Sequence, residues 1–129
     1  MSTTISGTNG VTFPDSTSMQ TGQQACKAWV NFNGTGTVAI RDGYNVSTIT
    51  DNGTGDFTVN FTNAMPNANY SALYTSDANA ITNTNPYTPS LRSGGVNASY
   101  VRVVTIQANT VGNIAGTDCA NNCVAIFSN

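Results

Sequence analysis

The chain has 129 residues, which limits it to one domain with at most a short tail. It contains no His and no Glu, so Ser-His-Asp and Cys-His catalytic groups and the usual zinc sites are excluded. The net charge of −2 and the pI of about 4.4, without a basic run, argue against nucleic acid or an anionic membrane as partner.

The composition favours an all-β fold. Charged residues make up 8% of the chain, against about 25% in ordinary globular proteins. Polarity comes instead from 18 Asn and 20 Thr residues. Thr is common in strands, whereas Asn and Gly suit tight turns that need a positive φ. No apolar run approaches the roughly 20 residues of a membrane-spanning helix, and no signal region follows Met1.

Residues 1–24 differ from the rest of the chain. They show no sustained helical or strand period, and Gly7, Gly10 and Pro14 would interrupt a helix. Their few bulky apolar residues cannot form a core: Ile5, Val11, Phe13 and Met19. We expect an extended segment that either lacks order or packs only against copies of itself. The head domain would then span residues 25–129.

Alternating apolar and polar residues predict strands from residue 25 onward. Asn52-Gly53 marks a tight hairpin turn, and the segment after it alternates most clearly, with Phe57, Val59 and Phe61 facing inward. The segment at 100–107 is apolar on both faces, which predicts a central strand. Seven strands are expected in all, at 28–32, 37–41, 44–50, 57–61, 69–75, 100–107 and 123–127. Their number and spacing predict an antiparallel β-sandwich.

Two polar stretches interrupt these strands and are the candidate binding loops. Residues 76–98 are predicted to form an extended surface loop, with at most a short edge strand, and long loops in compact domains are often functional. Hydrogen-bonding side chains, one aromatic ring and one guanidinium suit a glycan. The candidate receptor-binding residues are Asp77, Asn79, Asn83, Asn85, Tyr87 and Arg92. The alternative is an ordinary solvated loop. The stretch at 109–122 is a weaker candidate binding loop, and its candidate residues are Asn113, Asp118, Asn121 and Asn122.

Other conspicuous residues have structural explanations. Trp29 lies on the strand face opposite Val30, where it would either stack on a sugar or fill a subunit interface. Asp51 and Asp56 bracket a turn, where Asp usually accepts backbone N–H groups. They are too few for a calcium site, so no metal is expected. The odd number of cysteines favours reduced thiols over a disulfide between the last two, at 119 and 123.

Two stretches resemble bacteriophage tail-fibre proteins. Residues 6–17, SGTNGVTFPDST, are similar to a segment that lies in the thin trimeric fibre shaft or at its junction with the head. Residues 25–66 are similar to the module that typically ends such fibres, through ACKAWVNFNGTG, DNGTGDFTVNFT and AMP. The similarity covers about half of the chain. Beyond it, the match extends only to the outline of a polar loop and a closing hydrophobic strand.

The resemblance implies a homotrimer with a β-sandwich head at the fibre tip. This head would contact a host cell-surface polysaccharide or outer-membrane protein, and the remainder of the fibre would connect it to the virion. Assembly would take place in the host cytoplasm. The resemblance supplies no catalytic residue and no cofactor, so we expect a binding module and not an enzyme. Two alternatives stay open: a purely structural trimerisation domain, and a glycan-cleaving protein that uses two Asp carboxylates.

Overall fold

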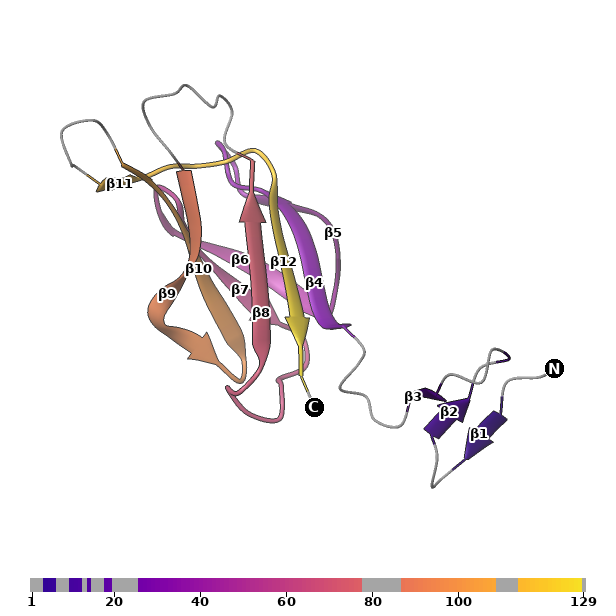
Figure 1. Cartoon of the computed structure of the whole chain (residues 1–129). Coiled ribbons are helices and arrows are strands. Elements are labelled where there is room, and N and C mark those ends of the chain that lie inside the picture. The colour runs from indigo at the N-terminus through magenta and orange to yellow at the C-terminus, as the bar shows by residue number, and fades with distance from the viewer. Residues whose placement is uncertain are drawn as a thin grey trace.

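The computed structural model describes residues 4–6, 10–12, 14, 18–19, 26–77, 87–108 and 114–128. The regular structure in these residues is β-strand, and they contain no helix of the length and apolarity that crossing a membrane requires. From residue 26 onward the strands form two antiparallel sheets that pack together (Figure 1). The predicted all-β sandwich is therefore confirmed.

The first sheet, called here the β4 sheet, has the strand order β5-β4-β12-β8. Its strands are β5 (Ala39–Tyr44), β4 (Cys26–Asn33), β12 (Asn122–Phe127) and β8 (Ser71–Ser76). The face assignment on β4 is confirmed, because Ala28, Val30 and Phe32 are buried whereas Trp29 is exposed. The same alternation buries Val124 and Ile126 of β12. One face of this sheet is thus core and the other is exposed.

The second sheet, called here the β10 sheet, has five strands. They are β6 (Val46–Gly53), β7 (Asp56–Phe61), β9 (Tyr87–Asn97), β10 (Tyr100–Ala108) and β11 (Ile114–Gly116). Strand β10 pairs with β7, β9 and β11, so its predicted central position is confirmed. The predicted hairpin around Asn52-Gly53 is also present, because β6 pairs antiparallel with β7.

The core lies between the two sheets. The rings of Phe32 and Phe57 meet edge to face across it, with centroids 5.3 Å apart, and both side chains are fully buried. A buried polar cluster joins the sheets as well. The hydroxyl of Tyr74 on β8 lies 2.7 Å from Thr105 Oγ1 on β10 and donates to Asn122 Oδ1 on β12 at 2.8 Å. Because these partners satisfy one another, the cluster fixes how the sheets align.

Three parts of the chain differ from the expected pattern. Residues 87–97 form the edge strand β9, longer than the short strand allowed for in the predicted loop. The second polar stretch contains the short strand β11. The N-terminal segment forms a separate three-stranded sheet from β1 (Thr4–Ser6), β2 (Gly10–Thr12) and β3 (Ser18–Met19), although its sequence lacks a strand period. Short and edge strands need only backbone partners, so their side chains carry little periodic signal.

Candidate functional site

The start of the first predicted binding loop and the end of the second lie together at one end of the sandwich. Asp77 Oδ1 accepts a hydrogen bond from the Asn121 backbone N–H at 2.7 Å, and its other carboxylate oxygen accepts from the Asn121 side chain. The Asp77 N–H in turn donates to the Asn121 carbonyl at 2.9 Å. Asp77 therefore holds the start of the first loop against the end of the second. Four of the predicted residues of these loops lie outside the described residues: Asn79, Asn83, Asn85 and Asn113.

The other candidates of the second loop also make internal contacts. Asp118 Oδ1 accepts the backbone N–H of Gly55 at 2.6 Å. Asn122 is fully buried, and its side-chain amide donates to the Cys119 carbonyl at 2.8 Å. Both side chains thus hold this segment against the sandwich.

Tyr87 and Arg92 lie on β9 and not in a loop. Tyr87 is half-buried where β9 begins, opposite Gln107 of β10. The side chain of Arg92 is half exposed, with its Nη1 atom 3.5 Å from Asp56 Oδ2. Arg92 therefore belongs to the β10 sheet, whereas Asp77 stands where β8 ends. The structure does not bring these predicted residues together into one described site.

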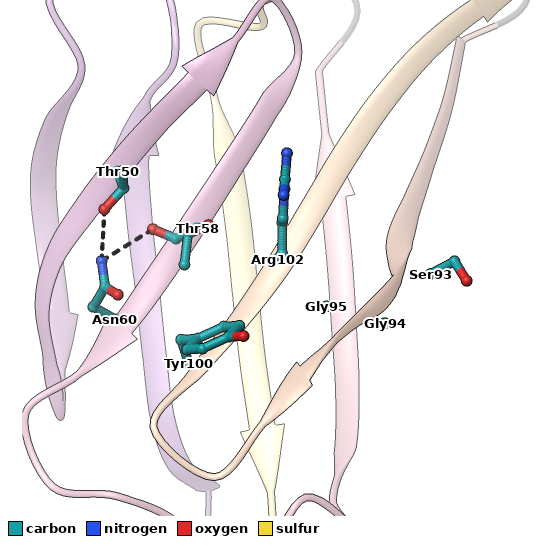
Figure 2. A pocket seen from close by; sticks show the side chains of 8 residues that line it. All are labelled: Thr50, Thr58, Asn60, Ser93, Gly94, Gly95, Tyr100 and Arg102. Carbon is teal, nitrogen blue, oxygen red and sulfur yellow. Dashed lines mark hydrogen bonds between the residues drawn. The ribbon is translucent and has the colours of Figure 1, made fainter.

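A polar groove on the outer face of the β10 sheet is the better candidate. It encloses about 300 Å³ and draws its residues from four strands. Figure 2 shows the Tyr100 ring at one end of the groove and Arg102 standing opposite the β9 segment 93–95. The Asn60 amide donates to Thr50 Oγ1 at 2.9 Å, which orients it within this face. The residues that line the groove are Thr50, Thr58, Asn60, Ser93, Gly94, Gly95, Tyr100 and Arg102.

An irregularity in β9 shapes one wall of this groove. The pairing of β9 with β10 shifts register between Val101 and Val103, where Gly94 adopts a φ of +70°. Such a bulge bends an edge strand locally. A Cβ on Gly95 would lie 2.7 Å from the Arg102 Cβ and 2.9 Å from the Arg92 carbonyl oxygen. Glycine at this position therefore lets the bulge pass close beside Arg102.

Sequence reasoning did not select these groove residues, although a signal was present. Tyr100, Arg102, Thr58 and Asn60 occupy outward positions on β10 and β7, where Tyr100 pairs with Asn60 and Arg102 with Thr58. On β7, the alternation that marked the inward face also implied an outward polar face. Which outward residues become neighbours depends on the register between strands far apart in the sequence.

Asp56 and Arg102 form the main charged contact beside the groove. Arg102 Nε donates to Asp56 Oδ1 at 2.6 Å and its Nη2 donates to Oδ2 at 2.8 Å, which makes a bidentate pair. The pKa of Asp56 lies below its ordinary value of 3.8. The hydrogen bond from Arg102 is the main cause, the positive charges of Arg102 and Arg92 add to it, and burial opposes it. The sequence assigned Asp56 to a turn, whereas its carboxylate is used in this ion pair.

This lowered pKa predicts acid sensitivity. A carboxylate with a depressed pKa in the folded state stabilises the fold above its unfolded value, about pH 3.8 here, and this contribution is lost as pH falls through the folded value. In Asp56→Asn, the free energy of unfolding should therefore fall less between neutral pH and pH below 3.8 than in the wild type. Denaturant unfolding followed by circular dichroism at each pH measures the difference. If the free energy of unfolding changed with pH equally in Asp56→Asn and in the wild type, the lowered pKa of Asp56 would be contradicted.

A second surface, called here the apolar row, crosses the exposed face of the β4 sheet. Trp29 pairs with Tyr44 on one side and with Ala125 on the other, and Ala125 pairs with Leu73. The exposed fractions are 60% for Tyr44, 38% for Trp29 and 56% for Leu73. A hollow of about 360 Å³ is lined by Trp29, Ala125 and Leu73 of this row. Neighbouring exposed side chains of this type commonly mark a contact with another protein.

The cysteines and acidic residues provide no further site within the described part of the chain. Cys26, Cys119 and Cys123 are free, and burial raises the pKa of the Cys119 thiol. No group of three or more metal-ligating residues is found there. Comparisons with protein-family models, with curated proteins and with solved structures gave no match. The resemblance to phage tail fibres stays a prediction.

Proposed function

We propose that this chain is an attachment module, the receptor-binding tip of a phage tail fibre, which binds host-surface glycan in the outer groove of the β10 sheet. The observation that carries the proposal is the make-up of the groove: an aromatic ring, an oriented amide, hydroxyl groups and a guanidinium line one hollow. Sugars present C–H faces that pack on aromatic rings and hydroxyls that exchange hydrogen bonds, so this combination suits them.

The location of the groove is consistent with this role. It lies on strands of a hydrogen-bonded sheet, so its side chains are held by a rigid support and need little ordering on binding. The groove is open and has both polar and apolar lining, which favours weak contacts with each sugar. A homotrimer would present three grooves on one particle, and their combined avidity would allow modest single-site affinity to hold a cell.

Binding should depend on Tyr100. In Tyr100→Ala, adsorption to host cells and retention on a glycan array should fall at least about fivefold, because a ring that stacks on a nucleic-acid base contributes about 1–3 kcal/mol and a ring packed on a sugar face is expected to contribute a similar amount. The backbone carbonyl of Tyr100, which accepts from the Tyr70 hydroxyl at 2.9 Å, is kept in this variant. The melting temperature should therefore change little.

Ile114→Ala is the control for that experiment. Ile114 is exposed on β11, outside both the groove and the apolar row of the other sheet, so its loss should leave glycan retention unchanged. Equal retention by Tyr100→Ala and the wild type would place the binding face elsewhere. No retention of any glycan by the wild type would count against the glycan-binding function itself.

The apolar row favours a second candidate, a structural trimerisation domain that joins copies of the chain. Trp29, Tyr44 and Leu73 together expose a continuous apolar strip, and the chain carries too few charges for its copies to repel one another strongly. Both roles fit one protein, because the row and the groove lie on the outer faces of different sheets.

Self-association through the apolar row predicts a particle of about 40 kDa, which is three copies of the 13.4 kDa chain. Light scattering after size exclusion should show this mass for the wild type and about 13 kDa for Trp29→Ser combined with Leu73→Ser. Thr48→Ala combined with Thr62→Ala changes two exposed residues outside the row and should leave the mass unchanged. A wild-type monomer, or a trimer that survives the double Ser change, would contradict this interface.

A further inference from the structure

One edge of the Arg102 guanidinium is hydrogen-bonded within the protein, and the other edge is available to a ligand. A guanidinium offers two pairs of N–H groups for bidentate contacts, one from Nε with Nη2 and one from Nη1 with Nη2. Asp56 occupies the first edge through both of its oxygens. For Nη1 the structure records no hydrogen bond within the described residues. The side chain is 36% exposed and lines the groove.

Asp56 makes this arrangement rigid. Its side chain is only 12% exposed, and it holds Arg102 by two short hydrogen bonds while Arg92 approaches from β9. An arginine fixed in this way has already lost much of its rotational freedom, so a ligand that binds its other edge orders less of the side chain. The glycine at 95 keeps the β9 bulge from displacing it.

The local charge favours an anion. Arg92 and Arg102 contribute two positive charges and Asp56 one negative charge, which leaves one surplus positive charge beside the groove of a chain with net charge −2. Asp51 is the remaining charged residue on the described strands of this sheet. It pairs with inward-facing Phe57, and its Oδ1 accepts the Gly53 N–H of its own turn.

We propose that the groove binds an acidic sugar, with the carboxylate or phosphate of the ligand on the Nη1–Nη2 edge of Arg102. This inference rests on the glycan-binding function proposed above and specifies its ligand class. Carboxylates and phosphates match the paired N–H groups of arginine, and hydrogen bonds to charged groups contribute more than neutral ones. The Tyr100 ring would pack on the sugar, and the amide of Asn60 would contact its hydroxyls.

The test compares three ligands that differ only at carbon 6: glucuronate, glucose 6-phosphate and glucose. Titration of the full chain, followed by ¹⁵N–¹H spectra, gives each dissociation constant and locates the ligand through the signals of Gly94, Gly95 and Arg102 Nε. At least one of the two acids should bind about tenfold more tightly than glucose, and added salt should reduce the difference. Comparison of glucuronate with glucose 6-phosphate shows whether the site prefers a carboxylate or a phosphate.

Arg102→Lys keeps a positive charge beside Asp56 but removes the second paired edge, so the preference for the acids should disappear. Arg41→Lys is the matched control, since Arg41 lies on β5 of the other sheet. If Arg102→Lys does not fold, Arg92→Gln removes the surplus charge without touching the bidentate pair and should weaken acid binding severalfold.

The outcomes separate the two proposals. Equal binding of all three sugars at the groove, or an acid preference that survives in both Arg102→Lys and Arg92→Gln, would overturn the anion site and leave glycan binding intact. If none of the three sugars shifted the ¹⁵N–¹H signals of the groove residues, and the glycan array retained no glycan, both the anion site and the glycan-binding function would be overturned.

Discussion

Replacing Phe57 with Ala is expected to lower the free energy of unfolding by about 3–5 kcal/mol, the range for large-to-small changes at buried aromatic residues. The side chain is fully buried and contacts Phe32 edge to face, with ring centroids 5.3 Å apart. The two rings belong to different sheets, so their contact is part of what holds the sandwich together. The change leaves a cavity that the β-sheet backbone on either side cannot close.

Urea unfolding monitored by circular dichroism measures this loss at a fixed protein concentration, which matters because self-association contributes to apparent stability. Leu91→Ala on the edge strand β9 is the control, since that side chain is 36% exposed, and its cost should stay below about 1.5 kcal/mol. Equal losses in the two variants would mean that the core is not where the structure places it.

Gly55→Ala should also be severely destabilising. Gly55 adopts a φ of +71°, a left-handed conformation that costs an L residue about 1–2 kcal/mol. A Cβ there would in addition lie 2.5 Å from the Thr105 carbonyl oxygen and clash with the backbone nitrogen of Thr117. Gly55 is tied in place by its own backbone, because its carbonyl accepts the Thr105 N–H at 2.8 Å. The neighbouring strands must separate to admit a methyl group.

Gly36→Ala isolates the conformational part of that cost. Gly36 has a similar φ of +63°, but a Cβ there would have no neighbour within 4 Å. Its cost should stay near 1–2 kcal/mol, and the excess at Gly55 then measures the clash. Both variants are compared by urea unfolding. Similar losses at the two glycines would show that the junction of β7 and β10 with residue 117 is looser than described.

Local sequence determined much of the fold. The inward faces of β4 and β7 follow from alternation alone, because Val30 and Val59 are buried at the positions that a period of two predicts. The hairpin of β6 and β7 follows from Asn52-Gly53, which suits a tight turn and joins neighbouring strands. Strand β9 was largely missed because an edge strand that carries Pro and Gly pairs through its backbone and needs no apolar period.

The candidate site was decided by tertiary structure. Arg102 takes an outward position on β10, a strand that the sequence marked as apolar on both faces, and its partner Asp56 is 46 residues away and was expected to lie beside a turn. The register of β7 against β10 brings the two together, and the bulge in β9 adds Arg92 beside them. Strand register is a long-range property, set by how whole faces pack against the core. A single sequence therefore indicates which side chains point outward, whereas the pairing of distant strands decides which of them form a binding surface.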